Sequence, residues 1–237
     1  KQVFDFLNTQ TCDANVASGN TPPTVDAGDD FTIPAQTPFV LTALASDAED
    51  VGLTYCWEEM DLGPALALSG ADNGSSPLFR SRNPVSEPSR FFPELGDILG
   101  STSDDDERLP TLGRAMTFRV TVRDNRLNGG GTDSDDMQVT VDAGAGPFLV
   151  TFPNTAVSIA GNQTVTWNVA NTAAAAVNTP HVNILLSIDG GQTFGTVLAA
   201  NTPNDGSQLV SLPALSTTTA RIKVEGAGNI FFDITNA

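Results

Sequence analysis

The sequence predicts an all-β fold of two tandem antiparallel β-sandwiches, the first with a long loop insertion. Three observations predict it. Apolar and polar side chains alternate in many short segments, as in strands with one buried face. Turn-forming residues separate these segments at intervals typical of a sandwich. No helix-length amphipathic pattern follows the N-terminal leader. The length of 237 residues suits two modules of about 100 residues each.

Composition divides the chain into a leader and two modules. Residues 1–19 are a leader and linker, in which Val3, Phe4 and Leu7 have helical spacing, as in the end of a preceding domain. Residues 20–143 form the first sandwich, with a weakly periodic insertion at 60–114. Residues 144–237 form the second sandwich, which follows a hinge of small residues.

In the first module, period-two alternation predicts the strands in order. They are the segments 39–45, 53–57, 116–122 and 137–141, of which 116–122 has the clearest alternation. Within the insertion, residues 91–100 predict one short helix. The acidic run 104–107 is expected to be solvated, because adjacent like charges repel one another and resist burial.

In the second module, strands are predicted around Val165–Val169 and Val182–Ile188 and in four further short segments. The segment 187–194, with the sequence SIDGGQTF, looks like an Asp-box hairpin, S-x-D-x-G-x-T-[WF]. Asp189 is expected to accept hydrogen bonds from backbone N–H groups of the turn, and Phe194 to fold back onto the hairpin. Such a motif predicts a structural hairpin rather than a ligand site.

The charge is strongly and unevenly negative. The chain has 11 basic and 28 acidic residues, a net charge of −17. Residues 1–145 hold 24 acids and 9 bases, whereas residues 146–237 hold 4 acids and 2 bases. Such a surface repels nucleic acid and anionic lipid, so neither is an expected partner. No apolar run approaches the roughly 20 residues of a membrane span, and no signal peptide is visible.

Cys12 and Cys56 are the chain's two cysteines. Two cysteines are too few for a cysteine-built metal site and are compatible with one disulfide in an oxidising compartment. Such a bridge would join the leader to the first module and contribute roughly 3–4 kcal/mol. The alternative is that both thiols are unpaired.

The residues provide little for catalysis. A zinc peptidase motif needs two histidines one helical turn apart, and a serine triad needs a histidine base. His181 is the single histidine and is interpreted as a surface loop residue. Glu58 and Glu59 are neighbours on a strand, so they face opposite sides and cannot flank one glycosidic bond. We interpret them as structural or metal-binding.

The turn at 46–52, SDAEDVG, is the best candidate for a ligand site. Asp47, Glu49 and Asp50 crowd carboxylates into a turn between two strands, and oxygen ligands in a flexible loop suit Ca²⁺. Asn20 from the linker and Asp124 after a strand would complete the coordination. The alternative is an ordinary acidic turn.

Longer blocks resemble a known family. Residues 20–61, with the block YCWEEMD, and the later segments FRVTVRDN and SDDMQVTV resemble the PKD-like, immunoglobulin-type module that follows the catalytic domain of bacterial reprolysin-like zinc metalloproteases. Residues 146–237, with NTPNDGS, are similar to the second β-sandwich of those enzymes. The resemblance implies immunoglobulin/PKD-like sandwiches, secretion from a bacterium and calcium near the acidic turn. The family's zinc motif lies upstream, so no zinc is expected in this chain.

Three interpretations of function follow. The first is a non-catalytic accessory region of a secreted metalloprotease, with an upstream protease domain and an extracellular protein or surface polymer as partners. The second is an extracellular structural or adhesive module that self-associates by strand addition, with residues 1–12 as the donor. The third is a carbohydrate-binding module, whose candidate aromatics Tyr55, Trp57 and Trp167 all fall on core-facing positions.

Overall fold

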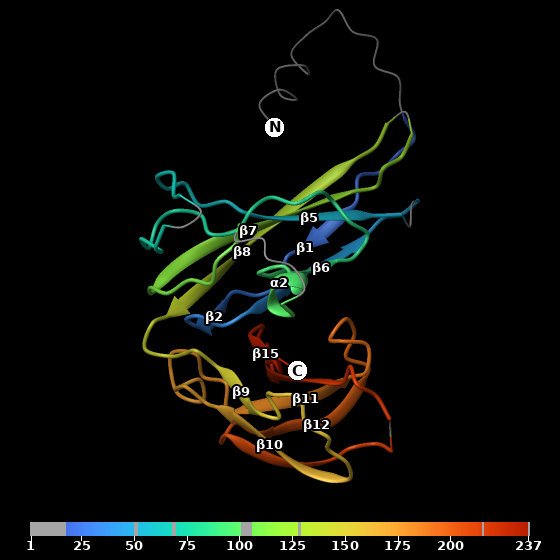
Figure 1. The fold of residues 1–237 in the computed structure, drawn as a ribbon. Helices are drawn as coiled ribbons and strands as arrows, with labels where there is room; N and C mark the ends of the chain where they lie inside the picture. The colour runs from blue at the N-terminus through green and yellow to red at the C-terminus, as the bar shows by residue number, and fades with distance from the viewer. Residues whose placement is uncertain are drawn as a thin grey trace, which may run out of the picture.

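The computed structural model describes residues 18–49, 52–67, 70–100, 106–127, 129–214 and 216–236. It confirms the all-β class, with strands forming two sandwiches one above the other (Figure 1). Strands β1–β8 build the first module and β9–β15 the second. The one described helix is α2, Leu95–Ile98, within the segment where a short helix is predicted. No helix of the described residues is long and apolar enough to cross a membrane.

The first module packs a four-stranded sheet against two short strand pairs. The sheet has the order β2 (Phe31–Pro34), β8 (Thr132–Asp142), β7 (Arg114–Arg123) and β5 (Thr54–Glu59). The short pairs are β1 (Thr24–Asp26) with β4 (Leu44–Ser46), and β3 (Phe39–Thr42) with β6 (Ser89–Phe92). Strand β7 shows why this sequence forms a sheet with one buried face. Its alternate residues Met116, Phe118, Val120 and Val122 are all fully buried on one side.

The insertion at 60–114 is not wholly a loop. It contributes β6, which pairs with β3 in register Phe39 to Phe92. The rings of Phe39 and Phe92 stack 5.0 Å apart, and both pack against Phe118. The sequence SRFF is too short to show a periodicity, so the alternation did not reveal this strand.

The insertion also covers the edge of the four-stranded sheet. Val85 forms an isolated bridge to Tyr55 on β5, in which each residue donates its N–H to the carbonyl of the other. The edge strand β5 therefore has a backbone partner on both sides at this point.

The second module places two sheets face to face. One has the order β9 (Leu149–Phe152), β10 (Asn162–Asn168) and β13 (Ser207–Ser211), with β10 in the middle. The other has the order β12 (Thr196–Pro203), β11 (His181–Ser187), β14 (Arg221–Gly226) and β15 (Phe232–Ile234). Val165, Val182, Ile184 and Val224 are fully buried between them.

The two modules are joined by backbone hydrogen bonds as well as by the chain. The N–H of Val40 on β3 donates to Ile230 O, and the N–H of Phe232 on β15 donates to Pro38 O, both at 3.0 Å. Phe39 and Phe231 form an antiparallel bridge between these strands. The sheet of the second module is thereby extended onto the strand pair β3–β6 of the first.

Apolar side chains also pack across this boundary. Buried residues of both modules belong to one continuous core, and a smaller cluster joins helix α2 to β15. In that cluster Phe91 meets Phe232 edge-on, 5.6 Å apart. At the connection itself, Gly146 has φ +99°, and a Cβ there would collide with the carbonyl of Ala35. The boundary is therefore a packed interface rather than a loose hinge.

Candidate functional site

Four of the five predicted calcium residues, Asn20, Asp47, Glu49 and Asp124, lie at one corner of the first module. Asn20 donates its side-chain amide to Asp124 Oδ2 at 2.6 Å. Glu49 accepts hydrogen bonds from the N–H of Thr21 at 3.3 Å and from the Thr21 hydroxyl at 2.9 Å. Asp47 accepts the N–H of Glu49 at 2.8 Å. The structure thus joins the linker to both the acidic turn and the end of β7.

The carboxylates of this corner already have donors. Asp124 also accepts the N–H groups of Gly131 at 2.7 Å and Arg126 at 3.0 Å, and these donors, with Asn20, lower its pKa below the usual range. Asp50 lies outside the described residues. Among the residues that the structure describes, no group of three or more His, Cys, Asp or Glu side chains is arranged to hold a metal ion. The calcium site stays a prediction.

Acidic side chains across the molecule accept backbone N–H groups, a role that the sequence predicted only for Asp189. Asp133 and Asp135 on β8 accept the N–H groups of Val25 and Ala27, which fastens β1 to the sheet beside it. The same role belongs to Asp26, Asp30, Glu59, Asp61, Asp72, Glu107, Asp142, Asp189, Asp205 and Asp233. Much of the negative charge therefore stabilises loops and strand ends.

Glu107 anchors the insertion, contrary to the expectation that the acidic run is solvated. Its side chain is fully buried and pairs with the guanidinium groups of Arg90 at 2.5 Å and Arg82 at 3.6 Å. It also accepts the N–H groups of Arg80 and Glu94. Burial raises its pKa, while the two arginines favour its charged form. Its neighbour Asp106 is bonded to Arg80 and Arg82, and residues 104–105 lie outside the described residues.

A second buried ionic cluster holds the start of the insertion. Arg114 pairs with Glu59 at 3.5 Å and with Asp72 at 3.2 Å, and all three side chains are nearly inaccessible to solvent. Glu59 also accepts the N–H groups of Leu78 and Phe79, and burial raises its pKa to about 7. Glu59 therefore has a structural role, one of the two roles that the sequence predicted for it.

Cys56 is buried and has no disulfide partner among the described residues, and its Sγ donates to the carbonyl of Arg82 at 3.3 Å. Burial raises the pKa of this thiol, so it is a poor nucleophile at neutral pH. Cys12 lies outside the described residues, and its pairing with Cys56 stays a prediction.

The aromatic residues considered for carbohydrate binding face the core, as predicted. Trp57 is 3% exposed and donates its indole N–H to Pro88 O at 3.0 Å, and Tyr55 is half-buried. Trp167 is 4% exposed and donates to Asn204 Oδ1 at 2.8 Å. Asn204, within the block NTPNDGS, in turn donates to Thr172 and Thr179. The alternation of apolar and polar residues did not predict that Asn204 is buried, because the proline and glycine near it are typical of a turn.

The segment 187–194 is a structural turn, as predicted. Asp189 accepts the hydroxyl of Ser187 at 2.6 Å and the hydroxyl and N–H of Thr193, and these donors lower its pKa. Phe194 packs beneath the ammonium of Lys223, which lies 4.9 Å from its ring centre. His181 is half-buried at the start of β11 and accepts the N–H of Ala227 through its backbone carbonyl.

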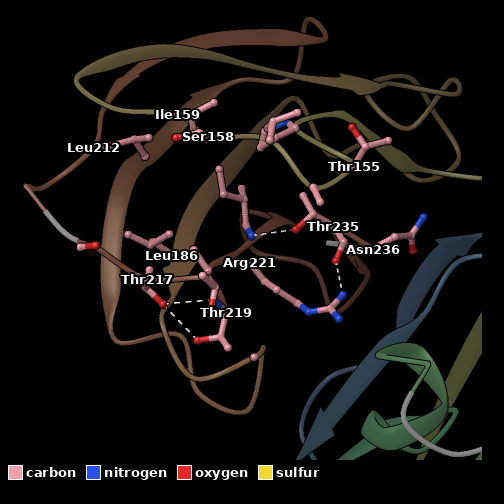
Figure 2. Close-up of a pocket in the computed structure, with 18 of the residues that line it drawn as sticks. Thr155, Ser158, Ile159, Leu186, Leu212, Thr217, Thr219, Arg221, Thr235 and Asn236 are labelled. Carbon is pink, nitrogen blue, oxygen red and sulfur yellow. Dashed lines mark hydrogen bonds between the residues drawn. The ribbon is translucent and has the colours of Figure 1, made fainter.

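One cavity opens on the flank of the second module. It has a volume of about 660 Å³ and lies between the two sheets (Figure 2). Leu186 and Ile222 come from one sheet, while Leu212 and Pro153 follow strands of the other. Threonine and serine side chains line the opening, and Arg221 is the one charged residue among the described residues that line it. Its guanidinium donates to the carbonyl of Thr235 at 2.6 Å.

Comparisons with known proteins show no family for this chain. No family model and no curated protein matches the chain. A chimeric titin Z1Z2 functionalised with a KLER exogenous peptide from decorin has 10% identity and a TM-score of 0.27, over 91% of this chain and 95% of that one. The FN1–FN3 domains of chicken CNTN1 have 12% identity and a TM-score of 0.29, over 90% and 60%. Both structures contain immunoglobulin- or fibronectin-type β-sandwich domains, and neither bears on reprolysin-like metalloproteases.

Proposed function

We propose that the chain is a non-catalytic binding and spacing region of a secreted bacterial zinc metalloprotease. Its extracellular partner is a protein or a surface polymer. The observation that carries the proposal is the packed boundary, at which β15 of one module hydrogen-bonds to β3 of the other. Domains joined by small polar interfaces move relative to one another, whereas an apolar interface with shared strand pairing holds them at a fixed angle. The blocks YCWEEMD and NTPNDGS support the choice of parent protein.

Two measurements on the intact chain test this proposal. Small-angle scattering should fit one rigid arrangement of both modules, because the interface contains Phe91 and Phe232 in edge-on contact. Incubation with fluorescent casein and with a mixed glycan panel should release no product. Hydrolysis of either substrate, or scattering that requires a broad distribution of intermodule distances, would falsify the proposal.

We also propose that Asn20, Asp47, Glu49 and Asp124, which lie at one corner of the first module, bind Ca²⁺ together with Asp50, and that this ion ties the linker to the first module. Calcium at about 100 times its dissociation constant should add about 2.7 kcal/mol to the free energy of unfolding. For a chain of this size we expect a rise in melting temperature of roughly 5–10 °C.

The calcium effect should vanish in the double variant Asp47→Asn/Asp50→Asn, measured by calorimetry with calcium and with the chelator EGTA. Asp205→Asn is the matched control, because Asp205 lies in a turn of the second module and accepts only the N–H of Ser207. Equal melting temperatures of the parent chain in calcium and in EGTA would remove the site.

A second candidate function is an extracellular structural or adhesive module that assembles into a fibre. The apolar cavity on the flank of the second module supports it, because an apolar opening between two sheets is a surface that a segment of another chain can bind. This candidate is independent of the protease parent.

A further inference from the structure

Four ionisable side chains gather where the insertion leaves and rejoins the four-stranded sheet of the first module. Glu59 ends strand β5, Asp61 follows it, Asp72 lies within the insertion, and Arg114 begins strand β7. The guanidinium of Arg114 contacts Glu59 Oε1 at 3.5 Å and Asp72 Oδ1 at 3.2 Å. The side chains of Glu59, Asp72 and Arg114 are 0%, 2% and 2% exposed. We call these four residues the junction cluster.

The junction cluster fastens two separate parts of the insertion through backbone groups. Glu59 Oε2 accepts the N–H groups of residues 78–79, at 2.7 and 2.9 Å. Asp72 Oδ2 accepts those of residues 111–112, at 2.9 and 3.1 Å, just before β7. A change in the ionisation of this cluster therefore acts on the attachment of the insertion at both places.

The junction cluster contains more acid than base. It holds three carboxyl groups and a single guanidinium group. Among the described residues, the charged groups that face Glu59 are Asp61, from the segment after β5, and Arg114, from β7. Asp72 contacts the other terminal nitrogen of the same guanidinium. If all three acids were ionised, the negative charges would outnumber the positive one in a place with little access to water, and such an excess is costly.

The carboxyl groups of Glu59 and Asp61 are in hydrogen-bonding contact with each other. Ionised carboxylates only accept hydrogen bonds, so a bond between the two requires a proton on one of them. Glu59 is the group placed to carry it, because Oε2 already accepts two N–H groups while Oε1 has the guanidinium only at 3.5 Å. Burial, aided by the contact with Asp61, raises the pKa of Glu59 to about 7.

We propose that Glu59 and Asp61 share one proton in the folded chain, and that this proton fastens the insertion, which loosens when its surroundings change from mildly acidic to neutral. The protonated oxygen of Glu59 donates to Asp61, and the other oxygen keeps its two backbone donors. The inference goes beyond the proposed spacer role and does not depend on it.

The direction of the effect follows from where the proton is held more tightly. Opening of the insertion exposes Glu59 to water, where its pKa returns from about 7 to its ordinary value of 4.5. The closed form is therefore stabilised fully below about pH 4.5, and this stabilisation is lost as the pH rises to about 7. Between these two values, each pH unit raises the opening equilibrium constant by up to about tenfold.

Carbon-detected NMR of chain labelled at the glutamate carboxyl carbon tests for the proton directly. One glutamate resonance that is missing from the spectrum of Glu59→Gln should titrate near pH 7. Asp61→Asn should move this titration to lower pH, because the acceptor of the shared proton is then no longer an anion. Titration of the Glu59 resonance in the ordinary range of glutamate, below about pH 5.5, or an unchanged midpoint in Asp61→Asn, would overturn the proposal.

Hydrogen exchange measured by mass spectrometry, corrected for intrinsic exchange rates, shows how firmly the insertion is held. In the parent chain, protection of residues 72–79 should fall by up to about tenfold per unit between about pH 5 and pH 7. Glu59→Gln should lose this dependence and stay protected, because the glutamine oxygen can accept both N–H groups while its amide donates to Asp61. An ionised Glu59 would give the opposite result, since Glu59→Gln would then leave Arg114 short of a counter-charge and lower protection at every pH.

The matched control is Asp233→Asn. Burial raises the pKa of Asp233 to about 6, but this residue lies on β15 of the second module, where it accepts the N–H of Val150. The insertion of this variant should respond to pH as in the parent chain. A response that persists in Glu59→Gln, or that disappears in Asp233→Asn, would count against the proposal. None of these outcomes changes the scattering or hydrolysis results that test the spacer role.

Discussion

Replacement of Glu107 by alanine should lower the free energy of unfolding by about 3–5 kcal/mol, since it leaves the largely buried guanidinium of Arg90 without its counter-charge. Arg82 would keep Asp106 and lose one of its carboxylate partners, and the N–H groups of Arg80 and Glu94 would lose their acceptor. Urea denaturation measures the loss. Limited proteolysis should show new cleavage between residues 60 and 114, because this one side chain joins several turns of the insertion.

The control for this experiment is Asp136→Ala, which breaks the ion pair with Arg119. Those side chains are 43% and 39% exposed, so the expected loss is below about 1 kcal/mol despite a distance of 2.6 Å. Equal losses of unfolding free energy in Glu107→Ala and Asp136→Ala would contradict the claim that burial makes the Glu107 ion pair important. Resistance of the insertion to protease in Glu107→Ala would contradict it as well.

Phe232→Ala should both destabilise the chain and uncouple its modules. Phe232 is 1% exposed and packs against Phe91 across the boundary, so its truncation should cost about 3–5 kcal/mol. With this contact removed, the second module should unfold separately from the first. Calorimetry should show two transitions in the variant and one in the parent.

Leu209→Ala is the comparison, because Leu209 lies on β13 of the same module and is 60% exposed. It should change the free energy of unfolding by no more than about 0.5 kcal/mol and keep a single transition. A single transition in Phe232→Ala would show that the backbone bonds of Val40 and Pro38 suffice to couple the modules.

The strands with long alternation were predictable from the sequence. Strand β7 buries every second residue from Arg114 to Val122, and β11 does so from Val182 to Leu186. The turn at 187–194 was also recognisable, because its donors and its acceptor lie within a few residues of one another. These features depend on local spacing, which a sequence displays directly.

The role of the acids was not predictable, because it depends on contacts between distant residues. Asp133 binds the N–H of Val25, 108 positions away, and nothing in the local sequence distinguishes it from a solvated aspartate. Glu107 likewise follows a run of like charges that indicates solvation, yet its partners Arg82 and Arg90 lie elsewhere in the insertion, Arg90 on strand β6. A carboxylate's environment is decided by the fold around it.

The predicted ligand residues were only partly brought together. The structure joins Asn20 to Asp124, and Glu49 to the linker at Thr21, so the sequence correctly indicated that linker and turn meet. It did not indicate the cavity of the second module, because residues far apart in the sequence, such as Val157, Leu186 and Ile222, line that cavity together.

The bridge between Val85 and Tyr55 restricts the directions in which copies of this protein can grow together. Since Val85 takes up both backbone groups of Tyr55, a neighbouring molecule cannot continue the large sheet sideways from that residue. The chain's own insertion thus protects this point of strand β5 against edge-to-edge aggregation.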